Sequence, residues 1–427
     1  MPLSKPRIIL LSLTVASAYA IWGICAALLP PFFPTEAKSK GATESHAGLI
    51  FGIYSLVGCI ASPLFGKYGS NFSPGFLYIP GAIIQAISTL SFGVLHYIDN
   101  LGLFLSLAYM LRMISGAAMA AVWGSLMAAL MTLFPDKVSK IVAATELSFG
   151  IGYMLGPALS GLLFITGGFV LPFVFGGSMA MLLVVFLFLA IPKVNVMQDD
   201  EIESKTFSTV RLLKIPGVIL PMVDCFAAAF SLNMVEAMLG LHLKSIGATM
   251  DIISAAFFIS GGGYMLSTFA SGFTTDTSTY PKILSILGNI GLVIAFTSIG
   301  PLPFIPRENG IPIILISFAV IGFCTGLVCV SSFTRAQRAA IVNGFPRDTK
   351  TYHIISGLWV SFDFMGAFLG PSIGGIAVEW WRFRTATMIY WILHLIMLVA
   401  DIIDLKYQFG AKNSFPDVKY AKLQTKD

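Results

Sequence analysis

Residues 146–161 read ELSFGIGYMLGPALSG, and a related stretch, DFMGAFLGPSIGG, occupies residues 363–375. Both stretches contain the pattern G-x-x-x-G-P-x-x-[SG]-G, with Gly156 and Gly370 at equivalent places 214 residues apart. That offset is half of the 427-residue chain. Repetition at half the chain length predicts two homologous halves, each with one copy of the motif.

The composition excludes an ordinary soluble protein. Hydrophobic residues make up 56% of the chain and charged residues only 11%, whereas soluble domains carry about 25% charged residues. The mean hydropathy is +0.85. These values predict an integral membrane protein with many spans. The net charge of +5 is spread over short loops, as orientation signals are, so it indicates no nucleic-acid partner.

Twelve apolar stretches are long enough to cross roughly 30 Å of hydrocarbon. Six fall in each half, which predicts an all-α membrane protein with twelve transmembrane helices in two pseudo-symmetric six-helix bundles. The predicted spans are 8–33, 47–66, 76–97, 102–134, 140–166, 169–191, 215–243, 251–273, 282–300, 311–335, 351–376 and 384–405. The predicted domains are an N-terminal bundle (1–192), a cytoplasmic linker (193–214), a C-terminal bundle (215–405) and a cytoplasmic tail (406–427).

Lysine and arginine counts predict the orientation. With the N-terminus in the cytoplasm, the inner loops and tails hold 19 of these residues and the outer loops hold six. This bias predicts that both termini are cytoplasmic. The stretch Ala18-Tyr19-Ala20 resembles a signal-peptidase site, but cleavage there would leave an odd number of helices. We therefore expect an uncleaved first helix.

Five ionisable residues fall inside the predicted spans. Each costs about 2.5–3.5 kcal/mol at the centre of a membrane helix on insertion scales. They are Arg112, Glu146, Asp224, Glu236 and Asp363. Four acids against one arginine predict a net negative interior, which attracts cations and protons and repels anions. This balance favours a small cationic substrate.

Glu146 is the predicted proton site. It lies centrally in the fifth span, where burial penalises the charged carboxylate, so we expect it to hold a proton and release it when a cation arrives. Asp363 is its expected partner, because the helical positions of the two acids differ by only about 60° in facing. The alternative is that Glu146 forms a structural ion pair with Arg112 on the adjacent span.

The seventh and twelfth spans carry further polar residues, for which the sequence predicts different roles. Glu236 shares a helical face with Asn233, and both are predicted to bind the cation; the alternative is that Glu236 snorkels at the outer end. Asp224 is expected at a gate or a cap. Asp401 and Asp404 lie at the inner end of the last span, where we expect water to solvate them.

The small residues and prolines of both motif copies are predicted hinge positions. Glycine lets helices approach closely, and proline removes a backbone hydrogen bond, so the two halves are expected to rock about a central site. Tight packing alone is the alternative. The predicted hinge residues are Gly152, Gly156, Pro157, Gly161, Gly366, Gly370 and Pro371.

Several motifs together resemble the major facilitator superfamily of transporters. Residues 112–116 (RMISG) are similar to its R-x-x-x-G element, and residues 152–161 are similar to the Gly-Pro motif typical of its antiporters. Gly272 and Asp276 match the start of its G-x-x-x-D-[RK] loop motif, which implies a gating role for both. The first-half counterpart of that loop, from Gly66, is degenerate.

Within that superfamily the chain resembles vesicular amine transporters, in particular the polyamine-transporter-like branch. The resemblance rests on FPTEAK at residues 33–38, followed by KGA at residues 40–42, on Glu146 ten residues before the Gly-Pro, on Glu236, and on residues 366–375. It implies proton-driven uptake of cationic amines into acidic vesicles. It also implies that Arg112 ties the fourth span to the proton site.

Other classes of function find little support in the sequence. The five cysteines lie in apolar segments without metal-ligand spacing, so we expect no metal site and no cofactor beyond the proton gradient. No nucleophile elbow, P-loop or dinucleotide fingerprint occurs, so we expect no enzyme. The expected partners are a cationic substrate, protons and the lipid bilayer, with no obligate protein partner. The alternatives are a facilitator or multidrug-type exporter of another solute, and a non-transporting receptor or scaffold.

Overall fold

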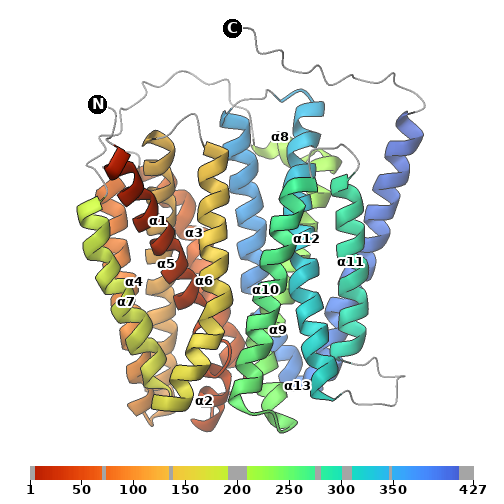
Figure 1. The fold of residues 1–427 in the computed structure, drawn as a ribbon. Helices are drawn as coiled ribbons and strands as arrows, with labels where there is room; N and C mark the ends of the chain where they lie inside the picture. Colours follow the sequence, from red (N-terminus) through yellow and green to blue (C-terminus); the bar gives the residue numbers. More distant parts are fainter. Residues whose placement is uncertain are drawn as a thin grey trace.

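The computed structural model describes residues 5–69, 74–133, 138–190, 209–274, 280–300, 310–345 and 349–412. Within these ranges every regular element is a helix. The long helices stand side by side as one upright bundle, with the two described termini, the start of α1 and the end of α13, at the same end (Figure 1).

The helices follow the apolar stretches of the sequence. The first half of the chain contains α1 (Lys5–Ala27), α2 (Phe33–Ser39), α3 (Glu44–Gly69), α4 (Pro74–Val94), η1 (Leu95–Tyr97), α5 (Leu101–Leu133), α6 (Val138–Gly167) and α7 (Val170–Ala190). The second half contains α8 (Thr209–Leu213), α9 (Pro216–Ser245), α10 (Met250–Thr274), α11 (Tyr280–Ile299), α12 (Ile311–Val342) and α13 (Thr349–Lys412).

The last element, α13, consists of two arms. Its helical geometry is interrupted at Arg382, where φ is 63° and ψ is 162°. The Tyr390 hydroxyl donates a hydrogen bond to the Gly370 carbonyl oxygen at 3.2 Å, so the second arm folds back along the first. The two arms therefore supply two membrane crossings.

The predicted all-α membrane architecture is confirmed. In the described residues, ten helices are long and apolar enough to cross a membrane, and α1 adds the shorter apolar segment Leu13–Ala27. With the two arms of α13 counted separately, these segments correspond to the twelve predicted spans. Some predicted ends were wrong. The first helix ends at Ala27, before the predicted residue 33, because Pro30 and Pro31 follow. In contrast, α12 and α13 continue past the predicted residues 335 and 405, to Val342 and Lys412.

The two motif copies pack in equivalent ways. In the first half, a Cβ added at Gly152 of α6 would overlap the backbone of Ala20 in α1. In the second half, a Cβ added at Gly366 of α13 would overlap the backbone of Phe226 in α9. One turn further on, the same relation holds for two more pairs, Gly156 with Ile24 and Gly370 with Phe230. Offsets of 214 residues between the glycines and 206 between their partners show that both halves use the same helix pairing.

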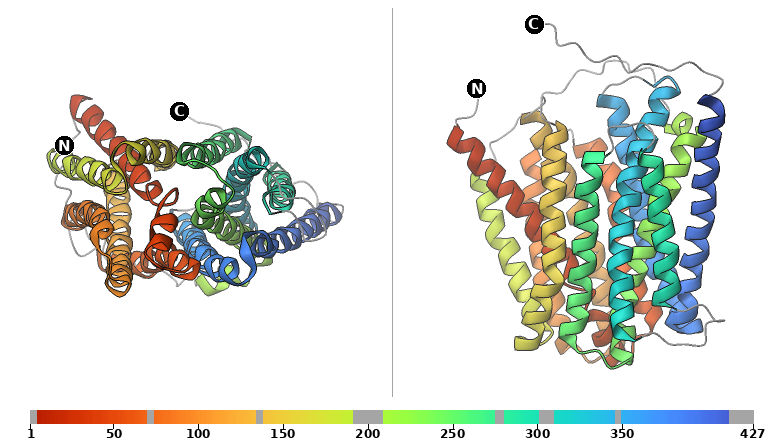
Figure 2. Two further views of the ribbon diagram at one scale, coloured as in Figure 1. Left: turned by 90° about the horizontal axis from the view of Figure 1, so that it is seen from below. Right: turned by 45° about the vertical axis from the view of Figure 1, so that its right-hand side comes forward.

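The last glycine of each motif copy instead contacts the opposite half. A Cβ added at Gly161 would overlap Ser254 of α10, and one added at Gly375 would overlap the backbone of Glu44 at the start of α3. Gly48 of α3 approaches Pro371 equally closely. Gly161 is near the end of α6, and the partners Glu44 and Ser254 are at the starts of α3 and α10. These helix ends lie at the end of the bundle opposite the described termini (Figure 2). The halves are therefore in close backbone contact at that end.

Candidate functional site

A hydrogen bond between a half-buried tyrosine and a buried carboxylate joins the two halves. The Tyr153 hydroxyl on α6 donates to Glu236 Oε2 on α9 at 2.6 Å. Glu236 is only 8% exposed, so it does not snorkel to the outer surface. The structure places this predicted carboxylate in the interior, at a contact between the halves.

Aromatic rings lead from the first half toward this carboxylate. The ring centroids of Trp123 and Phe149 are 5.1 Å apart, and those of Phe149 and Tyr153 are 5.9 Å apart. Tyr19 packs edge-on against Trp123 at 4.8 Å. Aromatic faces attract organic cations, so an aromatic row that ends at a carboxylate suits a cationic organic ligand.

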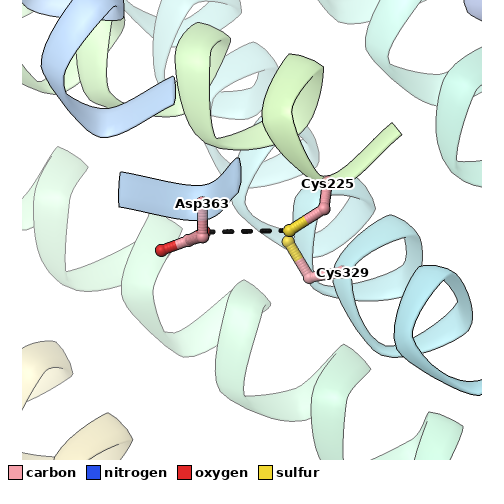
Figure 3. A group of neighbouring side chains, drawn as sticks. All are labelled: Cys225, Cys329 and Asp363. Carbon is pink, nitrogen blue, oxygen red and sulfur yellow. Dashed lines mark hydrogen bonds between the residues drawn. The ribbon is translucent and has the colours of Figure 1, made fainter. Parts of the chain in front are cut away.

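Asp363 lies at another level of the bundle. It is half-buried on the first arm of α13, and its Oδ1 is 4.0 Å from Cys225 Sγ on α9 (Figure 3). Cys225 and Glu236 are eleven residues apart on α9, which corresponds to about 16 Å of helix rise. The two predicted acids thus form two separate acidic levels, with Asp363 nearer the end that holds the termini.

The Asn233 side chain forms a hydrogen bond within its own helix. Its Nδ2 donates to the Ala229 carbonyl oxygen at 2.8 Å. The amide nitrogen is therefore occupied, and the side-chain oxygen is the atom of Asn233 that can accept a bond from a ligand.

Arg112 contacts the backbone of the neighbouring helix. Its Nε donates to the Ile50 carbonyl oxygen at 3.2 Å and its Nη2 to the Phe51 carbonyl oxygen at 3.4 Å. The guanidinium also lies over the Tyr54 ring, 4.3 Å from the centroid. These described contacts tie α5 to α3 and hold a fixed positive charge inside the first half.

For three of the predicted site residues, the structure does not describe the surroundings. Glu146 belongs to α6, but its side chain is outside the described set, so both its proton role and its ion pair with Arg112 stay predictions. Gly272 belongs to the last turn of α10, and Asp276 lies outside the described residues. Their gating role also stays a prediction.

The predicted hinge residues lie at close helix contacts. Both α6 and α13 continue as helices through Pro157 and Pro371. The backbone approaches of the motif glycines account for their small size by packing. Rocking about these positions stays a prediction.

The most extensive buried charge cluster was not predicted. Arg335 of α12 forms ion pairs with Asp224 Oδ2 and Asp401 Oδ1, both at 2.7 Å, and with Asp404 Oδ2 at 3.3 Å. Lys282 of α11 pairs with Asp404 at 2.7 Å. Asp224 and Asp401 are 0% and 1% exposed. The expectation of a solvated Asp401 was therefore wrong, because a buried arginine from α12 replaces water as its partner, whereas the Asp404 side chain keeps 27% exposure beside its ion pairs.

Neutral polar groups extend this cluster through the second half. Asn289 Nδ2 donates to Asp224 Oδ1 at 3.3 Å and to Asp401 Oδ2 at 3.1 Å. His394 bridges Asn289 Oδ1 and Ser231 Oγ, at 2.9 Å each. The helical spacing of these polar residues was the available signal. Asp401 lies seven residues after His394 and three before Asp404, so all three share one face.

Comparisons with known proteins identify relatives over most of the chain. The model of the Major Facilitator Superfamily matches residues 11–346. The chain is 27% identical over 356 residues to the MFS-type transporter SLC18B1 of Mus musculus, covering 82% of this chain and 76% of that protein. It is 22% identical over 364 residues to Multidrug resistance protein 2 of Bacillus subtilis, covering 82% and 84% of the two chains.

Solved transporter structures share the fold. The nucleoside transporter NupG superposes with a TM-score of 0.71 at 14% identity, covering 95% of this chain and 100% of NupG. A bacterial homologue of the human lysosomal transporter Spinster, in an inward-facing and occupied conformation, gives 0.67 at 14% identity, covering 96% and 98%. These superpositions confirm the predicted fold.

Proposed function

Because the chain belongs to the major facilitator superfamily, we propose that this multi-pass membrane transporter exchanges protons for organic cations by alternating access. The fold and the relatives are those of transporters. The observation that carries the finer proposal is the pair of interior carboxylates, Glu236 and Asp363, which have no ion-pair partner among the described residues.

The charge balance supports a cationic substrate. The buried Arg335 is already paired with Asp224 and Asp401, and Arg112 contacts backbone carbonyls of α3. Glu236 and Asp363 therefore add negative charge that a bound cation neutralises. A polar interior of one sign concentrates ligands of the opposite sign.

The spacing of the acids favours an elongated polyamine over a compact monoamine. Glu236 and Cys225, the neighbour of Asp363, are separated by about 16 Å of helix rise. A chain with several ammonium groups is therefore better suited than one small ammonium group to contact both acids at once. The aromatic row from Trp123 to Tyr153 adds cation–π surface beside Glu236.

Proton exchange follows from the same carboxylates. A buried carboxylate is most favourable either protonated or paired with a cation, so cation arrival and proton release are linked. Glu146 is the proposed proton site, with Arg112 holding the neighbouring backbone in place. No bound cofactor is needed, since the proton gradient supplies the driving force.

Alternating access requires two units that move relative to each other. We assign these to residues 1–192 and 215–405, joined by the linker 193–214, with Gly272 and Asp276 at a cytoplasmic gate. In this assignment the termini and the tail 406–427 are cytoplasmic, and the protein works in a vesicle or organelle membrane, as its resemblance to vesicular amine transporters implies.

One relative favours a second candidate, the export of apolar drugs. Multidrug resistance protein 2 of Bacillus subtilis matches over most of the chain, and the aromatic row would accept apolar ligands as well as cations. A drug exporter needs neither Asp363 nor a second acidic level.

The test is uptake into proteoliposomes with an acidic interior. We expect labelled spermine to accumulate more strongly than a labelled monoamine, and an ionophore that dissipates the pH gradient to abolish the accumulation. Flux of amines that ignores the gradient would overturn the coupling. Transport of neutral drugs without transport of amines would favour the second candidate.

A further inference from the structure

Two cysteines and an aspartate from three different helices meet inside the second half. Cys225 comes from α9, Cys329 from α12 and Asp363 from the first arm of α13. One ligand atom from each residue lies within 4.8 Å of the other two, and Figure 3 shows both sulfur atoms next to the carboxylate. The cysteines are 104 residues apart, so their spacing in the sequence does not predict the cluster.

We propose that Cys225, Cys329 and Asp363 bind a thiophilic divalent cation such as Zn²⁺ or Cd²⁺. Thiolate ligands select soft or borderline metals over Mg²⁺ and Ca²⁺. Zinc takes sulfur ligands at about 2.3 Å and carboxylate oxygen at about 2.0–2.2 Å, so its donors stand about 3.7 Å apart. Donors already within 4.8 Å reach that spacing by small side-chain rotations.

The site has one open position. Cys225 and Cys329 are 0% and 3% exposed, while Asp363 is only half-buried. Two sulfurs and one oxygen leave the fourth tetrahedral position for water or another ligand. The open side is that of the carboxylate, which is also the side from which an ion would enter.

Binding changes protonation but involves no redox step. Each cysteine thiol forms a metal–sulfur bond and releases its proton to solvent, and the metal keeps its 2+ charge. Two thiolates and one carboxylate around the ion leave a net charge of −1. Affinity therefore rises with pH.

Metal binding would also act on transport. An ion at this site ties α9, α12 and α13 together and occupies the Asp363 carboxylate. We expect it to block amine uptake, a consequence that rests on the proposed function. The binding itself does not depend on that function.

The experiment titrates Cd²⁺ into the purified full-length protein in lipid nanodiscs. The readout is the ultraviolet charge-transfer absorption of cadmium–thiolate bonds. We expect a saturable signal with one Cd²⁺ per chain and its loss in Cys225→Ser/Cys329→Ser. Because Asp363 is a direct ligand, Asp363→Asn should weaken the affinity by at least the roughly 10-fold that loss of an outer-shell partner costs. Cys59→Ser is the matched control, because this cysteine lies on α3 outside the cluster. An undiminished signal in the double variant, or none in the wild type, would overturn the site.

Separate readouts distinguish this inference from the proposed function. The thermal unfolding of each metal-free variant is measured first, and a variant enters the comparison only if it melts like the wild type. Amine transport without a cadmium signal would remove the metal site and keep the transporter. A cadmium signal without inhibition of uptake would keep the metal site and remove Asp363 from the transport path.

Discussion

At the scale of single residues, the informative feature is how each buried charge is accommodated. Glu236 accepts a hydrogen bond from Tyr153, and Asp363 has a thiol as its described neighbour. In contrast, Asp224 and Asp401 share an arginine. The first pair keeps charge available for a ligand, whereas the second is neutralised within the fold. We propose that this difference separates acids that take part in transport from acids that stabilise the fold.

Glu236→Gln tests the functional class. The amide oxygen still accepts the Tyr153 hydrogen bond, so we expect normal folding. The missing negative charge removes a charge-assisted contact worth about 1.5–3 kcal/mol, so initial rates of amine uptake in proteoliposomes should fall at least tenfold. Tyr153→Phe is the comparison, because it removes the hydrogen bond but keeps the charge. Wild-type uptake by Glu236→Gln would exclude this carboxylate from the transport path.

Arg335→Met tests the structural class. Removing the guanidinium leaves Asp224 and Asp401 buried without their cation, which typically costs about 3–5 kcal/mol. Thermal unfolding in detergent should therefore begin at a clearly lower temperature. Lys244→Met, at an exposed position, should leave unfolding unchanged.

A second variant distinguishes the loss of the Arg335 charge from the loss of packing by its side chain. Arg335→Met/Asp224→Asn/Asp401→Asn removes the stranded charges as well, so we expect it to unfold at a higher temperature than Arg335→Met alone. If the triple variant is the less stable of the two, charge compensation is not what holds these helices together.

At the scale of helices, the repeated glycines position the functional side chains. Gly366 and Gly370 set α13 against α9, which brings Asp363 next to Cys225. Equivalent glycines set α6 against α1, and Tyr153 lies between them in sequence. A change at a motif glycine should therefore disturb both packing and the site.

Gly370→Ala tests this positioning. The new methyl group would overlap the Phe230 backbone, so we expect less folded protein on size-exclusion chromatography and a lower unfolding temperature. Gly357→Ala is the matched control on the same arm of α13, where a Cβ meets nothing within 4 Å. It should be neutral or slightly stabilising, because alanine favours helix by about 1 kcal/mol over glycine. Equal behaviour of the two variants would contradict the packing role.

Hydrophobicity and repetition were enough to predict the helices and the duplication of the chain into two halves. The apolar stretches located the spans because a helix satisfies all of its backbone hydrogen bonds within one segment in lipid, and the repeated motif indicated the duplication. Side-chain contacts between helices far apart in the sequence could not be predicted. The partner of Asp224 lies 111 residues away on α12, and Arg335 resembled an ordinary loop cation because it follows an apolar stretch.

At the scale of the whole molecule, the described contacts close the end opposite the termini. Ser45 at the start of α3 donates from its backbone nitrogen to Glu379 Oε2 at 3.2 Å, and its hydroxyl donates to the same oxygen. Glu379 lies on α13, in the other half. This contact reinforces the glycine approaches at Gly48 and Gly375. Alternating access requires all of them to separate.

Glu379→Ala should favour that separation. Losing these exposed hydrogen bonds costs about 1 kcal/mol, or roughly a fivefold shift in a two-state equilibrium. Spin labels at Thr166 and Thr249, beyond the Gly161–Ser254 contact, would report a larger fraction of long distances by electron paramagnetic resonance. Lys244→Ala, at an exposed position of the same end, should leave the distance distribution unchanged. An unchanged distribution in Glu379→Ala would contradict the role of the Ser45–Glu379 contact in holding this end closed.

The most direct measurement is proton release on amine binding, followed with a pH indicator in weakly buffered solution. The interior carboxylates are proposed to give up protons when spermine binds. We therefore predict release by the wild type and its loss in Glu146→Gln/Glu236→Gln/Asp363→Asn, with spermine binding followed in parallel. Spermine binding without proton release in the wild type, or undiminished release in the triple variant, would contradict exchange at these carboxylates.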